Sequence, residues 1–146
     1  MPDEHSYGGD SPAVQAHLGI IQSVIQRMAA NSASCKAWCI TLVAAILVIV
    51  ADKGKPRYAL IAAIPTLLFL VLDAYYLAIE RCCRHSYNEF IEKVHSGRVV
   101  SADLYAVEPK GSLPRTFAQS LRSFSIWPFY TTLGVMIWLS MRLVIF

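Results

Sequence analysis

One acidic residue, Asp73, stands inside a long apolar stretch, in the sequence LFLVLDAYYLAIER. A carboxylate in hydrocarbon is costly unless it faces the interior of a helix bundle, takes up a proton or accepts hydrogen bonds. We expect its donors among Thr41, Tyr75 and Tyr76. Two roles follow from this position. The carboxylate either fixes the register of two helices through a hydrogen bond, or senses ions or protons in an oligomeric pore.

Charged residues beside the apolar stretches predict ion pairs between two antiparallel helices. If the chain turns at the sequence DKGKPR, aligning Lys36 with Glu80 also brings Arg27 level with Glu89. One register therefore gives two complementary pairs, which favours that register. The polar residues that we expect to line or gate a path through an oligomer are Asn31, Ser32, Thr41, Asp73 and Tyr76.

Cysteines and histidines are the residues that could bind a metal. The hairpin brings His17 level with His95, and it places two cysteines at the matching end of each span. A C-x3-C pair and an adjacent C-C pair do not make a common zinc signature, so we expect no metal and no cofactor. Cytoplasmic thiols stay reduced, which leaves acylation or plain packing as their role. These cysteines are Cys35, Cys39, Cys82 and Cys83.

The sequence contains none of the common catalytic motifs. It lacks G-x-S-x-G, H-E-x-x-H, a phosphate-binding glycine loop and a dinucleotide fingerprint. Its basic residues neither cluster nor alternate with aromatic residues, as they do on a nucleic-acid-binding surface. We therefore expect a protein that is not an enzyme, has no catalytic residues and binds no nucleic acid.

The composition indicates a membrane protein. Hydrophobic residues make up 55% of the 146 residues and charged residues 16%, against roughly 45–50% and about 25% in soluble domains. The apolar residues gather at 37–51, 58–79 and 123–141, and a helix needs about 20 of them to cross a bilayer. A soluble helix bundle would need a polar shell that this chain does not have. We therefore expect three spans in a lipid bilayer.

The first two spans are expected to belong to two long helices. Ser11 and Pro12 offer a helix cap with proline at the first helical position. The helix 12–51 then contains a cytosolic segment followed by the first span. The helix 58–96 contains the second span, with a kink at Pro65, followed by a cytosolic segment. Apolar residues repeat at spacings of four and three along the first cytosolic segment, at Val14, Leu18, Ile21, Ile25 and Met28.

The rest of the chain is expected to add a linker and a third span. Gly97 ends the second helix, and residues 97–114 suit an extended linker or a short hairpin. Ser112 can cap a further helix, so that 115–146 form an interfacial helix followed by the third span. The predicted fold is an all-α membrane protein, with a long antiparallel transmembrane helical hairpin that extends into the cytosol and a third C-terminal transmembrane helix.

The distribution of positive charge predicts the orientation of these spans. With three crossings, nine of the 13 Lys and Arg residues fall on the side of the N-terminus and four on the other side. Positive charge concentrates on the cytoplasmic side, so we expect a cytoplasmic N-terminus and an external C-terminus. A re-entrant third segment would instead place both termini on the cytoplasmic side. The sequence MPDEHSYGGD lacks the positive region of a cleavable signal, which makes the first span an uncleaved anchor.

Two segments carry a resemblance to known proteins. IQSVIQRMAANSASCKAW and PTLLFLVLDAYYLAIERCCR resemble a family of small uncharacterised bacterial membrane proteins with R-M-A-x-N-S before the first span and L-D-A-Y-Y-L-x-x-E-R closing the second. The resemblance covers roughly residues 17–95. The architecture is also similar to the SLATT type of two-span effector, from which this chain departs by its third apolar segment. By this match the positions of interest are Arg27, Asn31, Ser32, Lys36, Trp38, Asp73, Tyr75, Tyr76, Glu80 and Arg81.

Two functions stay open for this expected multi-pass protein of the bacterial inner membrane, and the resemblance implies the first of them. The first is an oligomeric effector or channel that perturbs or conducts across this membrane in antiphage defence, triggered by a nucleotide-sensing or protease-like partner. The second is a non-catalytic anchor or assembly subunit whose cytosolic hairpin docks a partner protein. We expect a homo-oligomer in either case, because Gly134 and Ser140 offer close contact points on the third span.

Overall fold

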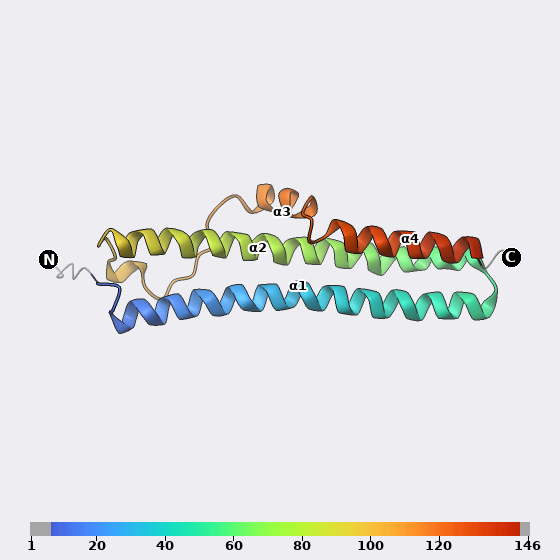
Figure 1. The fold of residues 1–146 in the computed structure, drawn as a ribbon, viewed down its shortest axis with the longest axis horizontal. Helices are drawn as coiled ribbons and strands as arrows, with labels where there is room; N and C mark the ends of the chain where they lie inside the picture. The colour runs from blue at the N-terminus through green and yellow to red at the C-terminus, as the bar shows by residue number, and fades with distance from the viewer. Residues whose placement is uncertain (1–6, 144–146) are drawn as a thin grey trace.

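The computed structural model describes residues 7–143, and within that range the chain is helical with no strand. Two long antiparallel helices, α1 (Pro12–Lys53) and α2 (Ala63–His95), lie side by side along the molecule (Figure 1). Two shorter helices, α3 (Leu113–Leu121) and α4 (Trp127–Leu143), lie against them. The predicted helical hairpin is therefore confirmed. The first six residues, which include most of the acidic N-terminus, and the last three lie outside the described residues.

Local signals in the sequence determine both ends of α1. Ser11 is the N-cap residue with an extended backbone, and Pro12 follows at the first helical position. The Ser11 side chain makes no capping hydrogen bond, but its carbonyl accepts the Gln15 N–H at 3.1 Å. Gly54 ends the helix with a left-handed backbone (φ 62°) that glycine adopts without a steric penalty. The observed helix matches the expected 12–51 to within two residues.

The segment that joins α1 to α2 differs from the prediction. Residues Pro56–Ala62 form a 3-10 helix, η1, so that α2 begins at Ala63 and not at residue 58. Pro65 then lies in the first turn of α2. A missing N–H costs nothing there, because the first N–H groups of a helix have no partner within the helix. The proline therefore lies next to the junction of η1 and α2, and not in the interior of one continuous helix as the sequence predicts.

A linker folds back along the hairpin after α2. Gly97 follows the C-cap residue Ser96 with a left-handed backbone (φ 65°), and the helix ends there as expected. The linker contains only a short 3-10 turn, η2 (Ser101–Asp103), and neither of its flanks is a strand. Val99 and Leu104 are buried against Val14 of α1 and Phe90 of α2. The extended form of the expected linker is confirmed, but the hairpin form is not found.

The two C-terminal helices pack on different parts of the hairpin. Ser112 precedes α3, and its carbonyl accepts the Thr116 N–H at 2.9 Å. α3 lies along α2, whereas α4 contacts η1, α1 and α2. α4 has 17 residues, so it is about 25 Å long. Its buried residues, which face the hairpin, are Tyr130, Leu133 and Ile137.

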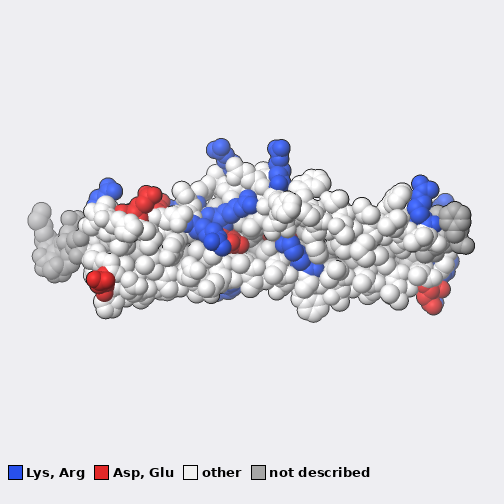
Figure 2. Space-filling model, viewed as in Figure 1, with Lys and Arg blue, Asp and Glu red and all other residues white. Residues whose placement is uncertain are grey.

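The surface of the hairpin is divided along its length. In Figure 2 one visible stretch between the middle of the molecule and the end at the α1–α2 turn bears no charged side chain. We call the segments 37–51, 58–79 and 127–143 the apolar half, and the segments 12–35 and 80–112 the polar half. α1 and the segment Pro56–His95 are each long and apolar enough to cross a membrane. Only 22% of the most apolar window of each is buried inside the structure.

Candidate functional site

Asp73 lies at the junction of the two halves, completely buried between α1 and α2. The Ser32 hydroxyl donates a hydrogen bond to Asp73 Oδ1. Lys36 Nζ lies 2.6 Å from Asp73 Oδ2 and 3.3 Å from Ser32 Oγ. Because residues four apart lie on one face of a helix, α1 presents both partners to the carboxylate. The negative charge of Asp73 is thus compensated within the bundle by one ammonium group and one hydroxyl.

A third helix also reaches this site. Tyr130 of α4 is buried, and its hydroxyl lies beside the Asp73 carboxylate. The ion pair with Lys36 holds Asp73 Oδ2 in the same site. We call Ser32, Lys36, Asp73 and Tyr130 the Asp73 cluster.

The structure separates most of the residues that we expect around Asp73. Thr41 is exposed, and its hydroxyl donates to the carbonyl of Ala37 at 2.9 Å. Tyr75 and Tyr76 contact each other, with ring centroids 6.1 Å apart. Of the proposed polar face, only Ser32 meets Asp73 inside the bundle. The expected donors Thr41, Tyr75 and Tyr76 are therefore wrong, and the expected interior position of Asp73 is confirmed.

Both predicted ion pairs of the hairpin are also wrong. Lys36 pairs with Asp73 and not with Glu80, which instead binds Arg84 at 2.8 Å. Glu89 pairs with Lys110 of the linker, and Arg27 is exposed, with no ion pair to any described residue. The register differs by seven residues, from Glu80 to Asp73. Seven residues are two helical turns, so a stripe with spacings of four and three matches its partner equally well in either register.

The four cysteines are buried and reduced, and they do not converge. Cys39 packs in the core of the apolar half, whereas Cys83 packs against Ile21 and Ile25 in the polar half. The Cys82 thiol lies 3.8 Å from the Thr116 hydroxyl of α3. Burial raises the pKa of the Cys83 thiol, and the neighbouring Cys82 adds to this effect. Within the described residues no three potential metal ligands come together.

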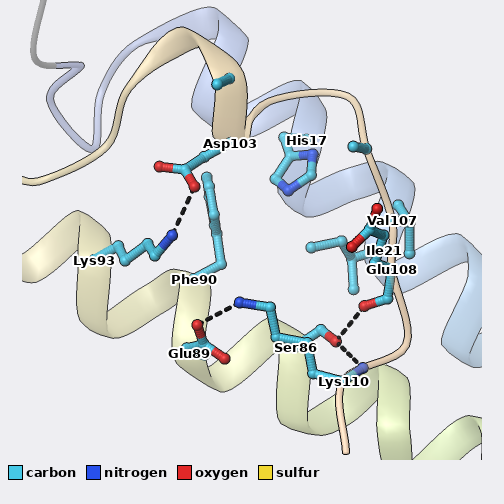
Figure 3. A pocket seen from close by; sticks show the side chains of 12 residues that line it. His17, Ile21, Ser86, Glu89, Phe90, Lys93, Asp103, Val107, Glu108 and Lys110 are labelled. Atoms are coloured by element: carbon cyan, nitrogen blue, oxygen red, sulfur yellow. Dashed lines mark hydrogen bonds and ion pairs between the residues drawn. The ribbon is translucent and has the colours of Figure 1, made fainter.

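A second polar site, which the sequence does not predict, lies where the linker covers the polar half (Figure 3). His17 of α1 is buried there, with its ring centroid 4.4 Å from that of Phe90 of α2. The Tyr105 N–H of the linker donates to His17 Nδ1 at 3.0 Å. Burial lowers the pKa of the His17 imidazole, and Asp103 opposes this effect. His95 is exposed, so the expected pairing of the two histidines is wrong.

Hydrogen bonds to the linker backbone strengthen this site. Tyr105 has a left-handed backbone (φ 65°), which is unfavourable for a residue with a side chain. Its hydrogen bond to His17 holds this conformation. The Ser86 hydroxyl of α2 donates to the Glu108 carbonyl at 2.7 Å and accepts the Lys110 N–H at 2.9 Å. The linker is thus fixed to both helices of the hairpin.

Ion pairs border the same site. Lys93 Nζ lies 2.6 Å from Asp103 Oδ1, and the Val100 N–H donates to Asp103 Oδ2 at 3.2 Å. Burial opposes ionisation of Asp103, but these two donors outweigh it and lower the pKa of the carboxyl. The hydrogen bond from Lys110 lowers the pKa of Glu89. His17, Ser86 and the pairs Lys93–Asp103 and Lys110–Glu89 line a cavity of about 220 Å³, so most of its charged groups are paired with one another.

Comparisons with known proteins assign no function to either site. No protein-family model, curated protein or solved structure matches this chain. The interpretation of the two sites therefore depends on their geometry. The Asp73 cluster joins three helices through a compensated charge, and the His17 site joins the linker to the hairpin.

Proposed function

We propose that the chain is a multi-pass protein of the bacterial inner membrane, with α1, η1 and α2, and α4 crossing the bilayer. The observation that carries this proposal is the low burial of the apolar helices, of which only 22% of the most apolar windows is covered. The core helix of a soluble protein is mostly buried. Large side chains of the apolar half such as Val48, Ile64 and Leu67 are instead more than 60% exposed. An apolar surface of this extent is typical of a site that contacts lipid or another protein, and its position along two long apolar helices favours lipid.

The dimensions of the helices support the same arrangement. The 42 residues of α1 extend about 63 Å, roughly twice the 30 Å of a bilayer core. The part from Lys36 to Lys53 covers about 26 Å, and α4 about 25 Å. Exposed aromatic residues lie near both boundaries, as in interfacial belts. They are Trp38 and Trp127 near the Asp73 cluster, and Tyr58 and Trp138 towards the α1–α2 turn.

Within this membrane protein, we propose that the polar half is a docking module for a cytosolic partner protein, so that the chain acts as an anchor or assembly subunit. Asp73 supports this function because Ser32 and Lys36 already satisfy much of its charge inside one chain. The carboxylate then locks the hairpin. The linker stiffens the cytosolic end through His17, Ser86 and Lys93, which suits a surface that must keep its shape.

The second candidate function is an oligomeric effector or channel acting in antiphage defence on a trigger from a nucleotide-sensing partner, and one observation favours its oligomeric state. Thr41, Ala44 and Ala45 are all exposed on α1 in the apolar half. Small residues let membrane helices approach closely, and a threonine hydroxyl can hydrogen-bond across such a contact. Several copies that meet along this face would form a homo-oligomer with Thr41 inside it.

The membrane proposal is tested by the topology of the protein in intact cells. Single cysteines replace Lys55 in the α1–α2 turn and Lys110 in the linker, and the cells are treated with an impermeant maleimide. We expect labelling of Lys55→Cys alone, since a cytoplasmic N-terminus puts the turn outside. The four native cysteines are buried and give little background. Release of the protein by alkaline carbonate, or equal labelling of both positions, would contradict the proposal.

The choice between the two functions is tested by leakage. Potassium and dye leakage are measured from cells that express the wild type, Asp73→Asn or Thr41→Leu at matched levels of inserted protein. An anchor causes no leakage in any of them. Leakage by the wild type that Thr41→Leu abolishes would favour the oligomeric effector. Thr132→Leu on α4 is the matched control, because the Thr132 side chain is also exposed and hydrogen-bonded to its own helix.

A further inference from the structure

We propose that a groove where α2, α3 and α4 meet binds an anionic phospholipid, with one acyl chain in the groove and the phosphate on Arg122. This proposal rests on the membrane insertion proposed above. The groove has a volume of about 440 Å³, within the usual range for small-molecule sites. Its apolar lining includes Leu70 of α2, Leu121 of α3, Ile126 just before α4 and Trp127 at the start of α4.

The groove has polar groups that match a lipid headgroup. Arg122, Tyr130 and Thr131 line it together with the apolar residues, and no acidic side chain does. The exposed Arg122 guanidinium makes no hydrogen bond or ion pair with any described residue. The nearby Arg81, in contrast, donates to Ser123 Oγ at 2.9 Å and to Ser120 Oγ at 3.4 Å. An unpaired guanidinium beside an apolar groove is complementary to a phosphate that carries an acyl chain.

The position of the groove favours lipid over other occupants. It lies at the turn between α3 and α4, beside the Asp73 cluster, where the apolar half begins. Phe124 and Trp127 are 88% and 60% exposed in the same turn, as expected for residues at a membrane interface. A helix from a second copy in this groove would bury Arg122 without a partner, which is costly. A headgroup leaves the guanidinium in the polar interface and supplies its counter-charge.

The proposal is tested by the fluorescence of Trp127. In the variant Trp38→Phe/Trp138→Phe, Trp127 is the remaining tryptophan. The protein is reconstituted in phosphatidylcholine vesicles that contain a minor fraction of either phosphatidylglycerol or phosphatidylcholine with brominated chains, which quench tryptophan on contact. One arginine near the surface favours the anionic lipid by about fivefold in association constant. We expect this preference for brominated phosphatidylglycerol, and its loss in Arg122→Gln.

A matched control and the opposing outcomes make this test decisive. Arg142→Gln removes a positive charge at the far end of α4 and should keep the preference. Equal quenching by both lipids would overturn the lipid site but leave the membrane insertion intact. Quenching that falls as the protein-to-lipid ratio rises would show that a second copy covers the groove, which also overturns the site. No quenching by either lipid would contradict both the site and the insertion.

Discussion

The two halves of the hairpin differ in the residues that η1 and α2 bury. In the apolar half these two helices bury alanines and short polar residues, such as Ala59, Ala62 and Ala74, while α1 and α4 bury larger residues, such as Val43 and Leu133. In the polar half α2 buries Phe90, and α1 buries Ile21 and Ile25. Along α2, the size of the buried hydrophobic side chains therefore changes on either side of the Asp73 cluster.

If the apolar half lies in the membrane, as proposed above, this difference reflects two kinds of surroundings for one pair of helices. In water, burying a large apolar side chain contributes roughly 1.5–3 kcal/mol, so the polar half places such residues between its helices. In lipid there is no such gain, and small residues let the helices approach for close packing. The free-energy gain from hydrophobic burial decreases at the junction of the two halves. There the buried ion pair between Asp73 and Lys36 fixes the register.

The largest expected effect comes from removing a large side chain from the polar half. Phe90→Ala deletes a ring that contacts His17, Val14 and the linker, and should cost about 3–5 kcal/mol of local stability. Hydrogen exchange of the backbone amides of residues 12–27 and 84–104 in detergent micelles measures this loss.

The matched control for this variant lies in the apolar half. Leu67→Ala removes a side chain that is 63% exposed, and should cost less than about 1 kcal/mol because lipid or detergent tails replace its contacts. Equal losses from the two variants would mean that both halves fold in the same surroundings, which would contradict the comparison.

The next largest effect comes from the junction. Lys36→Met leaves the Asp73 carboxylate buried without its ammonium partner, and should cost about 3 kcal/mol. The double variant Lys36→Met/Asp73→Leu should recover most of this loss, since an apolar pair needs no counter-charge. Unfolding in mixed micelles, analysed as a double-mutant cycle, gives the coupling between the two residues.

The control for the junction is an ion pair within one helix. Arg84→Gln breaks the ion pair with Glu80. Because the Arg84 side chain is 61% exposed, this variant should change stability by no more than a few tenths of a kcal/mol. A double variant that is less stable than either single variant would show that Asp73 and Lys36 stabilise the hairpin separately.

The sequence predicts the helices of this fold well and their contacts poorly. Ser11 with Pro12, Gly54 and Gly97 act locally, so the ends of the long helices follow from a few residues each. The register of the hairpin is not a local property. The apolar stripe repeats every seven residues, and a slip of two turns keeps it intact, so only the identity of the partner of Lys36 distinguishes the registers.

The His17 site could not be predicted for a related reason. His17 lies in the apolar stripe between Val14 and Ile21. A polar residue at a position of that stripe is the only local signal in the sequence. Its partner, Tyr105, is 88 residues away along the chain. The contact depends on how the linker folds back after Gly97, and no repeating pattern in residues 97–114 specifies that path.

A smaller, pH-dependent effect is expected at His17. Burial lowers the pKa of His17 below its ordinary value of 6.5, so the folded state holds the imidazole neutral. As the pH falls below 6.5, the unfolded state takes up the proton first, and stability decreases until the folded pKa is reached. Protonated Nδ1 can no longer accept the Tyr105 N–H, so hydrogen exchange of the linker amides should speed up in this window.

Two substitutions separate the role of His17 as a hydrogen-bond acceptor from the effect of its charge. His17→Asn keeps an acceptor near the Nδ1 position and should abolish the pH dependence. His17→Phe keeps a ring against Phe90 but leaves the Tyr105 N–H without its acceptor, at a cost of about 1–3 kcal/mol at every pH. A His17→Asn protein whose linker still loosens below pH 6.5 would show that another group titrates.

The smallest effect is expected at the exposed edge of the same site, where Lys110 of the linker is held both by its side chain and by its backbone N–H. Lys110→Gln removes the ion pair with Glu89, both of whose side chains are over a third exposed, and should not measurably change linker exchange. The Lys110 backbone N–H still donates to Ser86. Ser86→Ala removes this acceptor and the donor to Glu108, and should cost about 1 kcal/mol. If Lys110→Gln loosens the linker more than Ser86→Ala does, the surface ion pair holds the linker in place, and not the backbone hydrogen bonds. The effect of Lys110→Gln should then vanish in high salt.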